Sequence, residues 1–210
     1  MRMNPVLKKL YLEKEEFVTA DFLRRYCKSF DVDYESTIRN LSYRGYLVRI
    51  FRGIFYVRNL EEHNLGKTKY SHFELIAKGL ALKNITKWYF GLNTALKFNN
   101  MTHEVFTIDH VFNDSLFRAR PIDILRYKFH FHKISPSLLT FGVITNDMIR
   151  HSDPEKTILD FLYIWKYNGV PKERIIMDIT EYTKDISKEK LKRYVKHYPK
   201  TIETILEEIL

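Results

Sequence analysis

The sequence predicts a mixed α/β (α+β) chain with two domains, in which three helices and a hairpin precede a larger domain. Hydrophobic residues make up 45% of the 210 residues, so each domain has enough apolar material for a core. Apolar residues recur at helical spacing along most of the chain and alternate at strand spacing in several short segments. A polar stretch over residues 60–69 separates two groups of elements. We place the boundary there, between domains 1–66 and 67–210.

The elements of the first domain carry start and stop signals. Thr19 is a favourable N-cap for the second helix, and Gly45 is a natural residue just past the end of the third. Arg52 and Gly53 form a turn between two strands. The predicted helices span residues 5–14, 20–28 and 34–44, and extended segments span 17–19, 46–51 and 54–57. This is the element order of a winged helix-turn-helix.

The larger domain combines helices with a small sheet. Residues 126–134 alternate strictly between apolar and basic side chains, as in a strand with one buried face. Asp153 and Pro154 mark the start of a strong helix, as its N-cap and first helical residue. Further predicted strands span residues 105–111, 141–145 and 148–151, and further helices span 71–83, 85–99, 172–183, 187–197 and 201–210. The second domain is therefore predicted to be α+β with C-terminal helices.

The composition excludes several classes of protein. Cys27 is the only cysteine, so neither an intramolecular disulfide nor a cysteine-based zinc site can form. The first twelve residues lack the apolar run of a secretory signal, and no apolar run is long enough to cross a membrane. We therefore expect a cytoplasmic protein with no membrane partner. The net charge of +9 favours a polyanionic partner such as nucleic acid.

The positive charge of the first domain is concentrated in one segment. Residues 36–60 contain five arginines and no Asp or Glu, whereas residues 1–66 as a whole hold 12 Lys/Arg and 9 Asp/Glu. This segment comprises the third helix and the hairpin, which are the elements that contact DNA in winged-helix proteins. The alternative is that the arginines form an ordinary solvated surface.

The spacing of the third helix indicates which residues face outward. Tyr34, Ile38 and Leu41 recur at steps of four and three and would face the core. Arginine can pair with guanine and asparagine with adenine in the major groove, while Ser and Tyr can reach phosphates or base edges. The residues predicted to bind double-stranded DNA are Ser36, Arg39, Asn40, Tyr43, Arg44, Arg49 and Arg52.

Three segments resemble a known family, the AbiEi-type antitoxins. Its winged helix is similar to residues 41–57, which read LSYRGYLVRIFRGIFYV. Its Ser-Ala-Leu helix motif is similar to residues 92–96, although Asn93 and Thr94 replace the usual small pair. Its Pro-Glu-Arg-Thr-Leu-Leu-Asp motif resembles residues 154–160, with Lys156 in place of Arg. Residues 99–102, NNMT, depart from the His-Gly-Leu-Thr that is frequent in the family.

The resemblance implies a type IV antitoxin. Such a protein represses its own operon through the winged helix, at an operator with repeated sites, and counteracts a nucleotidyltransferase-like toxin without a stable complex. The alternative from another class is a stand-alone winged-helix transcription factor whose larger domain binds a ligand or a protein.

An enzyme, a cofactor and a metal site are not predicted. His130 and His132 share one strand face, with His103 and His110 elsewhere in the chain; part of a metal site is one interpretation, but the strand pair supplies only two ligands. Packing or surface histidines are the preferred interpretation. Glu155 and Asp160 lack a converging second acid of the kind that a catalytic carboxylate pair requires.

A lysine stripe marks one of the C-terminal helices. Lys188, Lys192 and Lys196 recur at every fourth residue, which places them along one face of a helix over residues 187–197. The two interpretations are a set of secondary phosphate contacts and a solvated helix face.

Overall fold

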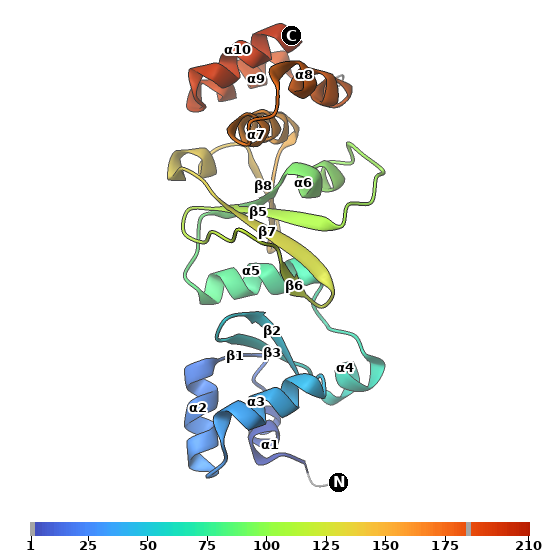
Figure 1. The fold of residues 1–210 in the computed structure, drawn as a ribbon. Coiled ribbons are helices and arrows are strands. Elements are labelled where there is room, and N and C mark those ends of the chain that lie inside the picture. Colours follow the sequence, from blue (N-terminus) through green and yellow to red (C-terminus); the bar gives the residue numbers. More distant parts are fainter. Residues whose placement is uncertain (1–2, 184–185) are drawn as a thin grey trace. The chain divides into compact units, whose positions relative to one another are not determined.

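A computed structural model describes residues 3–183 and 186–210 (Figure 1). The backbone forms two compact units: unit 1 comprises Met1–Asn84 with Ile124–Arg126, and unit 2 comprises Ile85–Asp123 with Tyr127–Leu210. Helices and strands occur in both units, so the predicted mixed α/β class is confirmed. In the described part of the chain, no helix is both long and apolar enough to span a lipid bilayer.

Unit 1 begins with the predicted order of helices and strands. Its first elements are α1 (Pro5–Leu12), β1 (Phe17–Thr19), α2 (Ala20–Ser29), α3 (Tyr34–Tyr43), β2 (Leu47–Phe51) and β3 (Ile54–Val57). The strands form an antiparallel sheet in the order β1-β3-β2. The Thr19 hydroxyl accepts a hydrogen bond from the Phe22 backbone N–H at 3.3 Å, and Gly45 has a left-handed φ of +78°. Both sequence signals therefore act as predicted.

Two more helices extend unit 1 past the predicted boundary. They are α4 (Leu60–Leu65), which lies in the polar segment predicted to hold the domain boundary, and α5 (His72–Leu82). Asn59 and Glu62 start α4, because each side chain accepts a hydrogen bond from the other residue's backbone N–H. Glu62 is also buried and accepts a hydrogen bond from the Tyr56 hydroxyl of β3.

The residues after α4 are also tied to the first sheet. Glu16, beside β1, accepts hydrogen bonds from Lys69 Nζ at 2.8 Å and from the Tyr70 hydroxyl at 2.7 Å. Unit 1 therefore continues beyond the predicted end at residue 66 as far as Asn84. The polar composition of residues 60–69 indicated a domain boundary, but the side chains of Glu62 and Lys69 bond to other parts of unit 1.

Unit 2 contains a mixed six-stranded sheet in the order β6-β7-β5-β4-β9-β8. Its strands are β4 (Trp88–Gly91), β5 (Ile108–Asn113), β6 (Ile122–Ile124), β7 (Tyr127–Lys133), β8 (Val143–Asn146) and β9 (Ile149–Ser152). β5 and β7 are parallel, as are β4 and β9, whereas β4 and β5 are antiparallel. The sheet is larger than the small sheet that the sequence predicts, because β4 was expected to be helical and β6 was not expected.

The predicted helix over residues 85–99 is a strand followed by the short helix α6 (Leu92–Phe98). The chain changes direction at Leu92, which has a left-handed φ of +50°. At Gly91 a Cβ atom would lie 2.5 Å from the Phe112 ring, so only glycine allows this approach to β5. The aromatic run before Gly91 therefore forms a central strand.

On one face of this sheet, α6 and α7 (Pro154–Tyr167) lie next to the strands, and three further helices pack on α7 (Figure 1). These are α8 (Lys172–Thr180), α9 (Lys188–Tyr194) and α10 (Lys200–Ile209), and 3-10 turns occur at Pro136–Leu139, Glu181–Thr183 and Val195–His197. The Asp153 side chain accepts a hydrogen bond from the Lys156 backbone N–H at 2.8 Å and so caps α7 as predicted. Buried side chains of α7, including Leu159 and Leu162, share a core with Tyr89 and Phe112 of the sheet.

Candidate nucleic-acid interface

The third helix is held in unit 1 by its cap and by one apolar face. The Asp33 side chain accepts a hydrogen bond from the Ser36 backbone N–H at 2.8 Å and starts α3. This bond, helped by the positive charge of Arg39, lowers the pKa of Asp33. Ile38 and Leu41 are buried in the core of unit 1. The opposite face of α3 therefore points away from this core.

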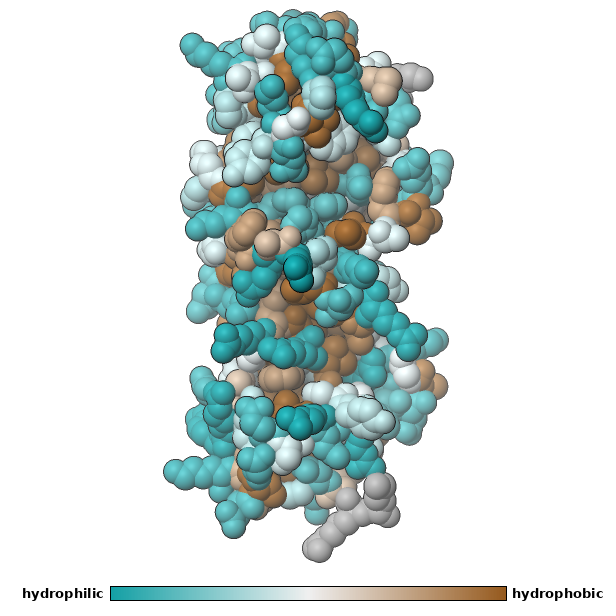
Figure 2. Space-filling model, in the orientation of Figure 1, coloured by the Kyte–Doolittle hydropathy of each residue, from teal (hydrophilic) through white to brown (hydrophobic). Residues whose placement is uncertain are grey.

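The residues that the sequence assigns to this outer face are exposed. Ser36, Arg39, Asn40 and Tyr43 follow the spacing of one helix face, and all four are solvent-exposed. Tyr43 is 91% exposed, so its ring contributes nothing to the core and is available for contact. Hydrophilic residues cover most of the N-terminal helices on the face drawn in Figure 2.

The predicted arginines after α3 are exposed as well. Arg44 caps the C-terminal end of α3, and its backbone carbonyl lies 2.9 Å from a ring nitrogen of His63. Arg49 is the exposed residue of β2, and Arg52 occupies the turn beside Gly53, whose φ is +77°. The structure therefore places all seven predicted residues on α3, at its end, on β2 or at the hairpin turn.

Arg58, the fifth arginine of residues 36–60, stabilises the structure of unit 1. Arg58 is half-buried, and its guanidinium donates a hydrogen bond to the Gly45 carbonyl at 3.3 Å. The Tyr11 hydroxyl in turn donates to the Arg58 carbonyl at 2.9 Å. Arg58 therefore secures the chain between α3 and β2.

Sequence reasoning overlooked one cation near α3. The Arg24 guanidinium of α2 lies 4.8 Å from the centre of the Tyr34 ring at the start of α3, and it also pairs with Asp21 at 2.8 Å. Only the packing of α2 against α3 shows this proximity. Arg24 therefore lies beside the first residue of α3.

The predicted lysine stripe is interrupted. Lys188 and Lys192 lie on α9, but Lys196 follows in the 3-10 turn Val195–His197, so the helical spacing of four does not continue to it. All three are exposed, and Lys188 Nζ donates a hydrogen bond to the Leu210 carbonyl at 2.8 Å. The groove that they line also includes the acidic residues Glu189, Glu203 and Glu207. Negative charge therefore accompanies the lysines.

The segment that resembles the Pro-Glu-Arg-Thr-Leu-Leu-Asp motif of the antitoxins forms a buried polar network. Lys156 Nζ lies 3.3 Å from Asp160 Oδ1, to which the Tyr198 hydroxyl donates at 2.6 Å. The Tyr89 hydroxyl donates to the other carboxylate oxygen at 2.8 Å. Burial raises the pKa of Asp160 and lowers the pKa of Lys156. The network is enclosed in the core, so the motif residues Lys156 and Asp160 join α7 to β4 and to the residues that precede α10.

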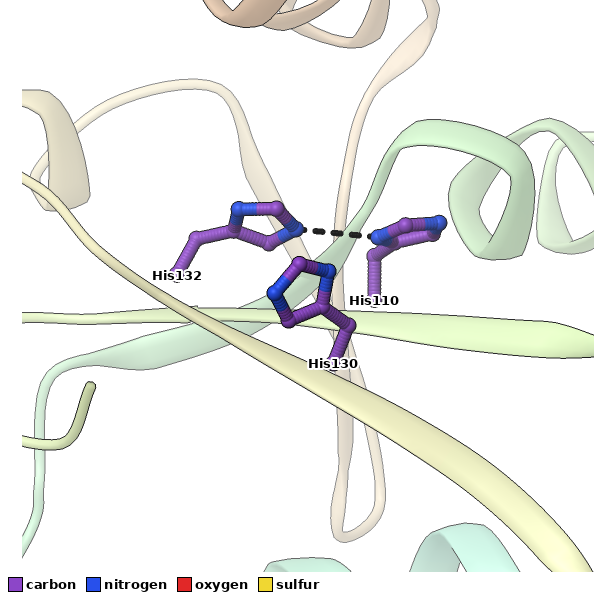
Figure 3. Close-up of side chains that lie close together, drawn as sticks. All are labelled: His110, His130 and His132. Atoms are coloured by element: carbon purple, nitrogen blue, oxygen red, sulfur yellow. Dashed lines mark hydrogen bonds between the residues drawn. The ribbon is translucent and has the colours of Figure 1, made fainter. Parts of the chain in front are cut away.

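Three histidines, of which the sequence places only His130 and His132 together, meet on the large sheet. His110 of β5 lies beside His130 and His132 of β7 (Figure 3). His110 Nδ1 is 2.9 Å from His132 Nε2. Burial, with the neighbouring histidines, lowers the pKa of His110 to about 3 and that of His132 to about 4. Sequence spacing could not reveal this cluster, because it depends on the register of β5 against β7.

Comparisons with known proteins address the fold. No protein-family model matches the chain, and no curated protein matches it. Among solved structures, the chain is similar to the RV2827C protein from Mycobacterium tuberculosis, known from a crystal structure, with a TM-score of 0.57 at 15% sequence identity. The alignment covers 98% of this chain and 75% of that chain. At this identity the likeness concerns the fold alone, over nearly the whole chain.

Proposed function

We propose that the chain is a DNA-binding transcriptional regulator whose α3 helix enters the major groove of its own operator. One observation carries the proposal: the outer face of α3 and the hairpin beside it present exposed arginines and hydrogen-bonding side chains, from a segment without Asp or Glu. The order of helices and strands around them is that of DNA-binding winged-helix proteins.

Each side chain of this surface has a role that suits its chemistry. Arg39 can donate two hydrogen bonds to guanine, and Asn40 can exchange two with adenine, so these residues read sequence. Ser36 and Tyr43 can bind phosphates or base edges at the rim of the groove. Arg49 and Arg52 would contact phosphates or the adjacent minor groove and so position the helix; Arg44, at the C-terminal end of α3, would do the same.

We further propose that this regulator is the autorepressing antitoxin of a type IV toxin–antitoxin operon. The support is the resemblance of three segments, in family order, to AbiEi-type antitoxins. On this proposal unit 2 counteracts a nucleotidyltransferase-like toxin without a stable complex, and the operator contains repeated sites. Both activities belong to the cytoplasm.

The second candidate is a stand-alone regulator whose larger unit binds a ligand. The histidine cluster on the sheet of unit 2 is the observation that favours it, because such a group can hold an effector. The two candidates share the DNA-binding surface and differ in the task of unit 2.

The DNA-binding proposal is tested by titrating the chain onto two duplexes, one from upstream of its own gene and one unrelated. We expect binding to the upstream duplex to be tighter by a factor on the order of a thousand or more. The triple variant Arg39→Ala, Asn40→Ala, Arg52→Ala should lose this preference and keep its circular dichroism spectrum. Equal affinity of the wild type for both duplexes would overturn the proposal.

The antitoxin proposal is tested by co-expression with the protein encoded by the adjacent gene. We expect that protein to be nucleotidyltransferase-like and to arrest growth, and we expect this chain to restore growth. The triple variant should still restore growth, since α3 and the hairpin lie in unit 1. Absence of such a neighbour, or failure of rescue, would favour the stand-alone regulator.

A further inference from the structure

Two parallel strands of unit 2 place three imidazoles on one face of the sheet. In the β5–β7 register, His110 pairs with His130, and Phe112 pairs with His132. Side chains alternate between the two faces of a strand, so the residues at these four positions share a face. Figure 3 shows the three rings gathered above the two strands, with His110 and His132 turned toward each other.

From this arrangement we propose that His110, His130 and His132 bind one divalent transition-metal ion of the Zn²⁺ class. Each histidine offers one ring nitrogen, and these nitrogens all lie within 4.8 Å of one another. Nitrogen ligands of a tetrahedral zinc ion, each about 2.0–2.1 Å from the metal, lie roughly 3.3 Å apart. His110 Nδ1 and His132 Nε2, at 2.9 Å, are already close to that spacing. A modest rotation of side chains would complete the set.

A bound ion would replace the hydrogen bond between the His110 and His132 imidazoles. One of the two facing nitrogens must carry the proton of this bond, and the other accepts it. When the ion binds, that proton moves to the other nitrogen of the same ring, and both facing lone pairs then point at the metal. No net proton is released by this exchange of tautomers, and no bond to carbon changes.

The histidines lie between the core and the surface. The Phe112 ring stacks on His132 with centres 4.8 Å apart and supports the imidazole from one side. All three histidines are half-buried, so the cluster is neither sealed in the core nor fully exposed. Lys97 is the cation that acts on His110, and its Nζ lies 3.7 Å from Asp109, which offsets its charge.

The ligand type defines the class of ion. Imidazole nitrogens favour zinc, copper, nickel and cobalt, whereas magnesium and calcium require oxygen ligands. Three protein nitrogens also leave a fourth tetrahedral position for water or for another ligand. The bound ion would link β5 to β7 and thereby stabilise the sheet of unit 2.

The test uses the full-length, untagged chain after removal of metals with a chelator. Titration with Zn²⁺, followed by calorimetry, should give one site per chain, and Co²⁺ should develop the visible absorption of a tetrahedral site. Zn²⁺ at about a hundred times its Kd should raise the midpoint of thermal unfolding by about 5–10 °C. His110→Gln, His130→Gln and His132→Gln should each weaken binding at least about tenfold. His103→Gln changes an exposed histidine outside the cluster and should leave binding unchanged.

A second measurement does not depend on the folding of any variant. The chain has eight histidines, and the ring signals of His110, His130 and His132 should shift together in nuclear magnetic resonance spectra as Zn²⁺ is added to the wild type. Absence of Zn²⁺ and Co²⁺ binding, or binding that shifts the other histidines instead of these three, would overturn the proposal. The outcome is independent of DNA binding by unit 1.

Discussion

Lys156 and Asp160 face each other across one turn of α7 inside the core of unit 2, with Nζ 3.3 Å from Oδ1 and with neither side chain more than 1% exposed. Two tyrosine hydroxyls complete the bonding of the carboxylate. Removal of one member of a buried ion pair leaves an uncompensated charge, whereas replacement of both by neutral groups is far better tolerated. The stability of unit 2 should therefore depend on the pair as a unit.

The effects of substituting Lys156 and Asp160 on the free energy of unfolding should therefore be non-additive. Lys156→Met alone should lower the free energy of unfolding by about 3–5 kcal/mol. The double variant Lys156→Met, Asp160→Asn should lose less, because the amide oxygen of Asn accepts a hydrogen bond from one tyrosine hydroxyl and the amide NH2 group donates to the other. Urea unfolding followed by circular dichroism measures both. A double variant that is less stable than Lys156→Met would contradict the prediction.

Much of the fold could be predicted from residues that act locally. Thr19, Asp153 and Gly45 mark the limits of helices because a cap or a left-handed turn is decided by a few neighbouring residues. The position of Glu62 could not be predicted from its neighbours in the sequence. Its burial depends on the Tyr56 hydroxyl of a neighbouring element, so its polar character indicated a domain boundary where the chain forms α4.

Of the two candidate sites, one could be predicted from local sequence and the other could not. The outer face of α3 follows from helical spacing alone, and the exposed positions agree with it. The meeting of His110 with His130 requires the register of two strands that are distant in sequence, which no periodicity supplies. The segment around Trp88 was misassigned because a short apolar run suits a strand as well as a helix, and packing against β5 decides between them.

A glycine in α5 tests whether this helix belongs to unit 1. A Cβ atom at Gly79 would lie 2.7 Å from both Ile50 Cγ2 and the Phe51 ring of β2. Gly79→Ala should therefore destabilise the protein by about 1–3 kcal/mol through overpacking. At an unpacked helix position the same change would stabilise by about 1 kcal/mol, so the sign of the effect is informative. A higher midpoint of thermal unfolding in the variant would show that α5 and β2 are not in close contact.

Base-reading and phosphate-binding residues should differ in their response to salt. Arg39→Ala or Asn40→Ala should cost about 1–3 kcal/mol on the operator and relax its sequence preference. Arg52→Ala should weaken binding to every duplex and reduce the dependence of affinity on salt concentration. Titrations at two salt concentrations on operator and unrelated DNA separate these effects.

The matched control for these titrations is Arg174→Ala. Arg174 is an exposed arginine of α8, in unit 2, and pairs with Asp178 at 3.2 Å. This variant removes the same charge from the chain without touching α3 or the hairpin, and its affinity should equal that of the wild type. If Arg39→Ala and Asn40→Ala also bind like the wild type, the recognition surface lies elsewhere.

Acid should destabilise the protein through His151 of β9. This side chain is 3% exposed, and burial lowers its pKa below the ordinary value of 6.5, although Asp153 acts in the opposite direction. The unfolded chain therefore binds more protons below pH 6.5, so the stability contribution is complete above that pH and is lost as the pH falls. His151→Leu should lose less stability than the wild type between about pH 7 and about pH 5. Urea unfolding at both pH values measures the difference, and equal losses would show that His151 does not titrate in this way.

The lysines of α9 and of the turn after it should be dispensable for DNA binding. Lys188, Lys192 and Lys196 share their groove with Arg193 and with three glutamates, and Lys188 is already bonded to the Leu210 carbonyl. A phosphate entering this groove would meet negative charge as well as positive charge, which reduces any attraction. The triple variant with Gln at all three lysines should therefore keep the DNA affinity of the wild type and its salt dependence, as well as the rescue of toxin-expressing cells. Arg52→Ala, assayed beside it, shows the size of effect that loss of one phosphate contact produces. A loss of DNA affinity in the triple variant would assign the lysines to the operator, and a loss of rescue alone would assign them to neutralisation of the toxin.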